Sequence, residues 1–346
     1  MNTHDSPHTA LTPSTAACEI ARLSRDARFD GVFFTAVLTT RIYCRPVCPA
    51  RAPKAENVVY YASAAAAQAQ GFRPCLRCRP ELAPGNLLWS HSEHLVTRAL
   101  KLINEGFLAD HPLDALAERL NVGARQLRRL FVKYLGAPPI AVHATQRLLF
   151  AKQLLTETAL SITDVALASG FGSVRRFNSA FAEANHAEPR ALRRSPAIRA
   201  DAAMVLRLGY RPPYDFKAVL GFLFNRALPG IESVDAQSYQ RVFGPAQSPG
   251  WLRVSAAPAG QHALRLELYN VAPAQLLNVV TRIRRMFDLD ADPQAIAQTL
   301  STSPSLAPLV ERYPGLRLPG GWDGFEVAVR AVLGQQVSVA AARTLA

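Results

Sequence analysis

Two closely spaced pairs of cysteines constrain the fold of this chain more than any other feature. Three residues separate Cys44 from Cys48, two separate Cys75 from Cys78, and 26 residues lie between the pairs. Two such pairs, brought together by a short folded insert, supply four thiolates in a tetrahedral arrangement, and zinc is the metal that most favours this arrangement. The spacing therefore predicts a small domain built around a Zn²⁺ ion bound by these four cysteines.

Arginines surround the cysteines in the sequence, and the chain as a whole is basic. Its formal net charge is +13, and residues 1–200 hold 25 Lys and Arg against 15 Asp and Glu. A surplus of positive charge of this size predicts a polyanionic partner, here double-stranded DNA. Six arginines next to the cysteines extend this prediction to the zinc domain itself: Arg41, Arg45, Arg51, Arg73, Arg77 and Arg79.

The use of cysteine also indicates a reducing compartment. Four of the five cysteines have metal-binding spacing, and the fifth, Cys18, is expected to be a partly buried free thiol. No apolar signal-peptide core follows the N-terminus, and no stretch approaches the length of a membrane span. We therefore expect a soluble protein of the bacterial cytoplasm, associated with the nucleoid and without a membrane partner.

A first domain is expected at residues 15–83, after a polar N-terminus, 1–14, that is expected to be disordered. Residues 31–39 and 57–62 are rich in β-branched and aromatic side chains, which predicts two strands. Residues 64–70 predict a short helix. The zinc site is thus expected to belong to a small α/β domain.

Residues 92–195 contain an approximate internal repeat. In each copy two short helices with apolar stripes flank a tight turn, at 121–123 in the first and 170–172 in the second. This is the pattern of a helix-turn-helix, so we predict an all-α domain with two such units, joined by a long amphipathic helix over 140–156.

The second helix of each unit supplies the candidate DNA contacts. Exposed arginines on a helix are often only a solvated face, but two such faces on duplicated units favour DNA binding. The candidates are Arg125, Gln126, Arg128 and Arg129 in the first unit, and Ser173, Arg175, Arg176 and Asn178 in the second.

The last third of the chain changes character. Strand-like runs around one helix near 215–225 predict a small α/β domain at 203–271. Helical patterns follow over 272–346 and stop at Ala346 without a capping signal, so this part is expected to be the beginning of an all-helical domain. The predicted fold class is multidomain α+β: a small four-cysteine zinc α/β domain, an all-α double helix-turn-helix domain, a small α/β domain and the start of an all-helical domain.

Four zinc-bound thiolates can act chemically as well as structurally. Because each ligand binds deprotonated, the cluster carries a formal charge of about −2, and its electron-rich sulfurs can displace a methyl group from an electrophile. Methylation of one ligand lowers the charge to about −1, which weakens the repulsion from DNA phosphates. The alternative is a closed zinc site that only holds the domain together, which is the commoner case.

Two stretches around the cysteines closely resemble the metal-binding domain of the Ada family of bacterial alkylation-response proteins: TTRIYCRPVCPAR at 39–51 and GFRPCLRC at 71–78. The resemblance implies that Cys44 irreversibly accepts the methyl group of a methylphosphotriester in DNA. It assigns Cys48, Cys75 and Cys78 as the remaining zinc ligands. It also implies contacts to the DNA backbone from Thr40, Arg51 and Arg73.

Residues 92–195 resemble the AraC-type DNA-binding domain that follows the zinc domain in Ada-like proteins. One departure concerns the end of the second reading helix, where the family usually has Gly-x-x-Pro. Here the glycine position holds His186, and Pro189 follows. Histidine adopts the left-handed conformation less readily than glycine, so the geometry of this helix end is open.

The last third resembles AlkA-type 3-methyladenine DNA glycosylase II, on RPPYDF at 211–216, LRLPG at 316–320 and VRAVLGQQVSV at 329–339. The resemblance implies that Gln335 and Gln336 contact DNA near a flipped base, although a helix-terminal polar pair is the alternative. The family's helix-hairpin-helix and catalytic aspartate do not occur before the chain ends, so glycosylase activity is expected only in a longer chain. Asp323 is instead expected to be a helix N-cap with Glu326 three residues on.

Together these features predict a DNA alkylation-damage response protein. A suicide methyl transfer to Cys44 would turn it into a DNA-binding transcriptional activator, with RNA polymerase as a further partner, and a longer chain would also excise alkylated bases. Two alternatives remain: a transcription factor with purely structural zinc, and a glycosylase that the front domains deliver to DNA. A second acceptor for alkylated guanine is not expected in this chain, because no cysteine follows Cys78.

Overall fold

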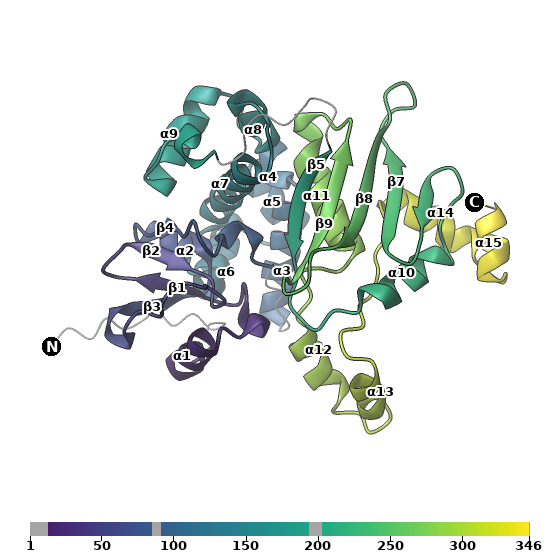
Figure 1. The fold of residues 1–346 in the computed structure, drawn as a ribbon, viewed down its shortest axis with the longest axis horizontal. Coiled ribbons are helices and arrows are strands. Elements are labelled where there is room, and N and C mark those ends of the chain that lie inside the picture. Colours follow the sequence, from purple (N-terminus) through teal and green to yellow (C-terminus); the bar gives the residue numbers. More distant parts are fainter. Residues whose placement is uncertain (1–12, 85–90, 194–202, 346) are drawn as a thin grey trace. The chain divides into compact units, whose positions relative to one another are not determined.

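The computed structural model describes residues 13–84, 91–193 and 203–345. The chain divides into two compact units, Met1–Pro196 and Ala197–Ala346, and Figure 1 labels their elements. The first unit contains the cysteines and the predicted helix-turn-helix repeat. Most of the N-terminal segment predicted to be disordered, 1–14, lies outside the described residues.

A four-stranded sheet forms the centre of the cysteine-containing part. Its strand order is β3-β1-β2-β4, with β1 antiparallel to both β2 and β3, and β2 parallel to β4. Along the chain, one helix, α1, precedes the sheet and another, α2, lies between β3 and β4. The elements are α1 (Thr15–Ser24), β1 (Phe34–Val37), β2 (Ile42–Cys44), β3 (Val58–Tyr61), α2 (Ala64–Ala69) and β4 (Arg73–Pro74).

Local signals explain where these short helices begin and end. Ser14 and Ser63 cap α1 and α2, since each side chain accepts a hydrogen bond from a backbone N–H of the first turn. Gly71 follows α2 with a φ of 75°, a left-handed conformation that glycine adopts without strain. The predicted strands and the predicted helix are thus present. Among the described α-helices and strands of this part, α1, β2 and β4 were not predicted, and β2 and β4 are only three and two residues long.

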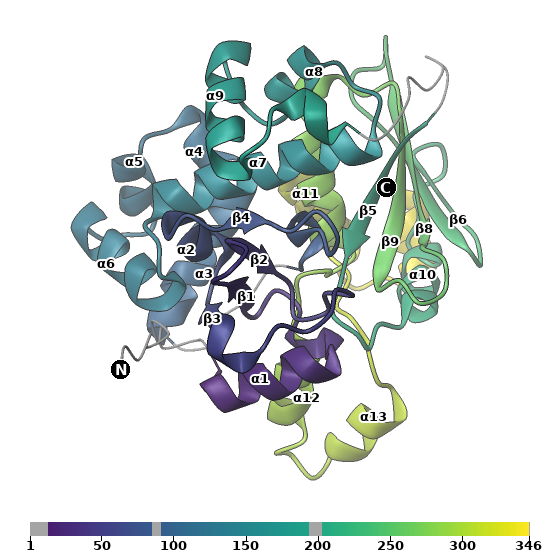
Figure 2. The same ribbon diagram turned by 60° about the vertical axis from the view of Figure 1, so that its left-hand side comes forward.

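The rest of the first unit is helical, as predicted. Figure 2 shows α5 with α6 and α8 with α9 as two neighbouring pairs, each a helix-turn-helix, with α7 between them. Apolar side chains of α5 and α6 form one core, and Phe177 and Phe181 of α9 are fully buried. The helices are α3 (His91–Asn104), α4 (Phe107–Asp110), α5 (Leu113–Arg119), α6 (Ala124–Leu135), α7 (Pro139–Glu157), α8 (Ile162–Ala168) and α9 (Val174–Asn185).

Helix α7 corrects one sequence-based expectation. The predicted long helix at 140–156 is present, but it is not amphipathic, because buried residues occur all round it. Thr145, Lys152 and Gln153 are among the buried side chains, together with Leu154 and Leu155. A helix with buried residues on several sides does not show a single apolar stripe. Two of these buried polar side chains, Thr145 and Lys152, contact the zinc domain.

The second unit contains a five-stranded antiparallel sheet in the order β5-β9-β8-β7-β6. Its strands are β5 (Met204–Gly209), β6 (Glu232–Val234), β7 (Ser238–Phe243), β8 (Gly250–Ala256) and β9 (Ala263–Tyr269). The helices of the unit are α10 (Phe216–Phe224), α11 (Leu276–Met286), α12 (Pro293–Leu300), α13 (Ala307–Arg312), α14 (Gly324–Leu333) and α15 (Val339–Leu345). The four predicted strands and the inserted helix are all present. Among the described strands of this unit, only β6, three residues long, was not predicted.

Polar contacts hold α14 to this unit. No described side chain of α14 is buried, and Phe325 is 82% exposed. Glu326 pairs with Arg241 at 2.5 Å, and Arg330 pairs with Glu232 at 2.7 Å. The expected N-cap at Asp323 is present, since its carboxylate accepts the Glu326 backbone N–H at 2.8 Å.

The buried side chains of α7 allow a prediction about the stability of the first unit. Leu154 is fully buried there, whereas Ile140 on the same helix is 51% exposed. We expect Leu154→Ala to lower the free energy of unfolding by about 2–5 kcal/mol, because it removes buried methyl groups and leaves a cavity. Ile140→Ala is the matched control and should change it by less than about 0.5 kcal/mol. Urea unfolding followed by circular dichroism measures both, and equal losses would contradict the packing described here.

Candidate metal centre and DNA-binding helices

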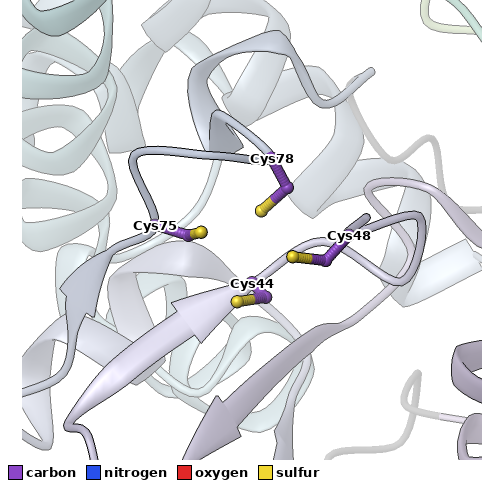
Figure 3. Close-up of side chains that lie close together, drawn as sticks. All are labelled: Cys44, Cys48, Cys75 and Cys78. Atoms are coloured by element: carbon purple, nitrogen blue, oxygen red, sulfur yellow. The ribbon is translucent and has the colours of Figure 1, made fainter. Parts of the chain in front are cut away.

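The parallel pairing of β2 with β4 brings the two cysteine pairs together. Tyr43 lies opposite Pro74 in the register, so Cys44, the last residue of β2, and Cys75, the residue after β4, lie side by side at the carboxyl ends of the two strands. The Cys75 N–H donates to the Tyr43 carbonyl at 3.0 Å. Cys48 and Cys78 lie in the turns that follow, and in Figure 3 all four sulfurs face a common space.

The four side chains fit a zinc ion. Their ligand atoms all lie within 4.8 Å of one another. A tetrahedral site with Zn–S bonds of about 2.3 Å requires sulfurs roughly 3.8 Å apart. Among the described residues, this cluster contains four thiols and no histidine or carboxylate, a donor set that selects zinc over harder ions. The sequence-predicted ligands are thus together, two buried and two half-buried.

Hydrogen bonds distinguish the four sulfurs. The backbone N–H of Arg45 donates to Cys78 Sγ at 3.3 Å, and that of Arg77 donates to Cys75 Sγ at 3.3 Å. A backbone hydrogen bond from Ala50 reaches Cys48. Within the described part of the chain, no backbone N–H donates to Cys44 Sγ. Since each such bond draws negative charge from sulfur, Cys44 retains the most.

Two of the six neighbouring arginines form ion pairs within the first unit. Arg45 is paired with buried Asp30, its Nε donating to Oδ1 at 2.8 Å, and it also donates to the Cys78 carbonyl at 3.1 Å. Arg79 pairs with Glu81 at 3.1 Å and with Glu157 at 3.0 Å. These guanidiniums stabilise the loops that carry the cysteines.

The residues expected to contact DNA in this domain are accessible. Thr40 and Arg51 are exposed, and Arg73 in β4 is half-buried. Arg77 is also exposed, whereas the Arg41 guanidinium packs over the Phe72 ring at 4.3 Å. The surface near the thiolates therefore carries accessible positive charge, and the DNA contacts of Thr40, Arg51 and Arg73 stay predictions.

Helix α6 presents the first candidate reading face. Leu127 and Phe131 are fully buried on its inner side. The four predicted DNA-contacting residues lie away from this side, as a period of 3.6 residues requires. They are Arg125, Gln126, Arg128 and Arg129.

Helix α9 presents the second candidate reading face, and its DNA contacts stay predictions. Arg175 and Arg176 are accessible, but Asn178 is only half exposed. Ser173 is the N-cap of the helix, its hydroxyl accepting the Arg176 backbone N–H at 3.4 Å. Ser173 therefore has a local structural role, whatever it contacts in DNA.

Sequence reasoning missed Arg147, which supports the turn before α9. From α7 its Nε donates to the Ser169 carbonyl at 2.8 Å, a second donor reaches the Gly170 carbonyl, and the guanidinium lies 4.0 Å from the centre of the Phe171 ring. A single arginine inside a helix carries no sequence signal for this function. At the other end of α9, His186 adopts the left-handed conformation, with a φ of 52°, so the usual helix end forms without glycine.

The remaining residues considered from the sequence are two exposed glutamines and one buried cysteine. Gln335 and Gln336 are exposed after α14, and Gln336 has a φ of 60°. Their contact with DNA stays a prediction. Cys18 is fully buried in α1, and burial raises the pKa of its thiol to about 12. It is therefore an unreactive core residue and not part of the metal centre.

Comparisons with known families match the three parts of the chain. Residues 17–81 match the metal binding domain of Ada, residues 116–195 a helix-turn-helix domain, and residues 205–323 the AlkA N-terminal domain. The predicted zinc and the predicted multidomain α+β fold are thereby confirmed, and the helix-turn-helix match supports DNA as a partner. The domain boundaries stay predictions.

Three curated proteins illustrate the relationship. A probable bifunctional transcriptional activator/DNA repair enzyme AlkA of Mycobacterium tuberculosis is 43% identical over 94% of this chain and 66% of its own length. The bifunctional transcriptional activator/DNA repair enzyme AdaA of Bacillus subtilis is 31% identical over 46% of this chain and 74% of its own. DNA-3-methyladenine glycosylase 2 of Escherichia coli is 37% identical over 40% of this chain and 46% of its own length. The chain thus spans just under two thirds of the first of these relatives. None of the described helices is both long enough and apolar enough to cross a membrane.

The metal centre predicts one zinc ion per chain. We expect Cys78→Ser to lose most of the bound zinc, because it removes a buried ligand. Cys18→Ser, which replaces a cysteine outside the cluster, should keep it. Metal analysis after gel filtration measures both, and equal zinc in the two variants would remove Cys78 from the site.

The exposed arginines of α6 and α9 predict how the affinity for duplex DNA depends on salt concentration. We expect Arg128→Ala and Arg175→Ala each to weaken binding to duplex DNA and to reduce the slope of log K against log salt by about one, because each removes a phosphate-neutralising charge. Arg147→Met should instead act through the turn that it supports, and should lower the thermal stability as well. Fluorescence titrations at several salt concentrations test this. An unchanged slope in Arg128→Ala and Arg175→Ala would place the DNA elsewhere.

Proposed function

The chain belongs to the Ada-type family of bifunctional transcriptional activator/DNA repair proteins, and from this premise we propose that Cys44 irreversibly accepts the methyl group of a methylphosphotriester in DNA. Each molecule acts once, and the methylated protein is the activating form. Two properties of Cys44 support this choice. The residue is only half-buried, and within the described chain its sulfur accepts no hydrogen bond from a backbone N–H.

The transfer is a direct displacement. The Cys44 thiolate attacks the methyl carbon, an S–C bond forms, and the C–O bond to the phosphotriester breaks. The oxygen leaves with the electron pair as an ordinary phosphodiester, so no proton or further reactant is needed. When bound, zinc supplies the low pKa that keeps the four sulfurs deprotonated at neutral pH.

Competition between the cysteines favours the same residue. Cys75 and Cys78 are buried and their sulfurs accept backbone hydrogen bonds, so both are less nucleophilic and less accessible. Cys48 is half-buried, but a hydrogen bond from Ala50 draws charge from its sulfur. Cys44, at the end of β2, is left as the accessible and electron-rich thiolate.

Methylation then strengthens DNA binding by reducing negative charge. The cluster changes from a formal charge of about −2 to about −1, which weakens its repulsion from DNA phosphates. Exposed Arg51 and Arg77 beside the cluster and the faces of α6 and α9 provide the attraction. We propose that the bound protein contacts RNA polymerase at promoters in the bacterial cytoplasm.

A second function is supported by the match of residues 205–323 to the AlkA N-terminal domain. We propose that the whole protein also excises alkylated bases such as 3-methyladenine, with Gln335 and Gln336 near the flipped base. Excision that continues when Cys44 is replaced would separate this function from methyl transfer.

The acceptor proposal predicts the mass and position of one modification. After incubation with duplex DNA that contains methylphosphotriesters, the intact protein should gain one methyl group, located on Cys44 by peptide mapping. Cys44→Ser should gain none. Cys18→Ser is the matched control, since it replaces a cysteine outside the metal centre, and it should gain one methyl group as the unsubstituted protein does.

Two outcomes would contradict the proposal. A methyl group on a cysteine other than Cys44 would mean that the hydrogen-bond pattern does not select the acceptor. An unmodified protein that is folded and zinc-bound would leave a transcription factor with structural zinc.

A further inference from the structure

One face of α7 lies against the zinc domain. Thr145, Leu149, Lys152 and Thr156 follow one another at intervals of four, three and four residues, so they share one side of the helix. Thr145 donates to the Gln68 side chain at 2.8 Å, and Leu149 packs against the core of the zinc domain. The other two contact the loop that carries the second cysteine pair.

Lys152 makes the most buried of these contacts. Its side chain is 1% exposed, and its ammonium donates to the backbone carbonyl of Cys75 at 2.9 Å. The same ammonium pairs at 2.7 Å with Glu81, which is also 1% exposed. A buried charge is costly unless it is paired and hydrogen-bonded. Loss of either partner of this contact is therefore expected to destabilise the folded protein strongly. A lysine of the helical domain thus directly contacts the backbone of a zinc ligand.

The loop from Cys75 to Glu81 is attached to α7 at both of its ends. Lys152 holds the Cys75 carbonyl at one end and the Glu81 carboxylate at the other. Between them Arg79, next to the ligand Cys78, reaches Thr156 at 2.7 Å and Glu157 at 3.0 Å. Two of the four zinc ligands therefore lie in a loop whose position depends on one helix.

The same helix reaches the second reading unit. Arg147, one turn and a half before Lys152, holds the carbonyls of Ser169 and Gly170 in the turn that precedes α9. The zinc-ligand loop and this turn are therefore both hydrogen-bonded to side chains of α7. An element with packed contacts to both sites can carry a coupling free energy between them.

We propose that Lys152 is a positioning residue of the metal centre, which couples zinc binding at the Cys75–Cys78 loop to the stability of α7 in the DNA-binding domain. Zinc orders the loop, the loop holds Lys152, and α7 is thereby stabilised. By linkage the effect is reciprocal, so an intact α7 increases the affinity for zinc. The proposal rests on zinc binding alone and holds whether or not Cys44 accepts a methyl group.

The test is hydrogen exchange of the full chain with zinc bound and after chelation. In the unsubstituted protein, removal of zinc should raise the exchange rate of the amides at 150–157 by about tenfold or more, since local opening then lacks the loop contacts. Helix α11, in the other unit, reports on effects unrelated to the site and should not change.

Variants at Lys152 separate coupling from general stability. Lys152→Met keeps the aliphatic stem and removes the ammonium. The double variant Lys152→Met with Glu81→Gln also neutralises the carboxylate, which would otherwise keep only Arg79 as its cationic partner. Both should lose most of the zinc-dependent difference at 150–157 and bind zinc about 10- to 100-fold more weakly, a loss typical of residues that orient metal ligands. Lys133→Met is the matched control, because Lys133 is exposed on α6.

The possible results divide clearly. Lys152→Arg keeps a cation. If this variant retains part of the zinc-dependent difference in amide exchange at 150–157 that Lys152→Met loses, the coupling works through the charged contact. If Lys152→Met and the double variant keep the full difference, or if the unsubstituted protein shows none, the proposal is wrong. Methyl uptake does not enter this test, so failure here is distinguishable from failure of the acceptor proposal.

Discussion

The convergence of four thiolates is the constraint on which the first unit depends. The sheet that carries them has only four short strands, and the buried residues of α2 beside it are all alanines. A domain this small buries little apolar surface, so metal ligation is expected to supply part of its folding free energy. The parallel pairing of β2 with β4 is decisive here, because it places Cys44 and Cys75 next to each other through backbone hydrogen bonds alone.

The arginines around the centre divide into two groups with different consequences. Arg45 and Arg79 form buried ion pairs and shape the cysteine loops, whereas Arg51 and Arg77 remain exposed beside the cluster. The first group makes the sulfur environment unequal, since the Arg45 backbone and side chain both contact Cys78. The second group leaves positive charge where DNA phosphates can reach it. One residue type therefore serves both structure and recognition in the same domain.

Helix α7 shows where sequence reasoning about this fold stops. Its length was predictable from the repeat that it joins, but its environment was not, because burial on several sides erases the periodic pattern. Lys152 and Thr145 are polar, yet both are buried against the zinc domain. The strands β2 and β4 were missed for a related reason, since a pair of two or three residues is stabilised by its neighbours rather than by its own propensity.

The sequence by itself determined the zinc ligands, the duplicated helix-turn-helix and the accessible face of α6, because spacing and periodicity are local properties that survive without coordinates. Only the tertiary structure decided which sulfur lacks a backbone donor within the described chain, which arginines are already paired, and that Lys152 reaches the Cys75 carbonyl. The longer-range of these contacts, Arg45 with Asp30, Lys152 with Cys75 and Arg79 with Glu157, join residues that are 15, 77 and 78 positions apart in the chain. Distance and burial between such residues follow from the packing of whole elements, and no local pattern encodes them.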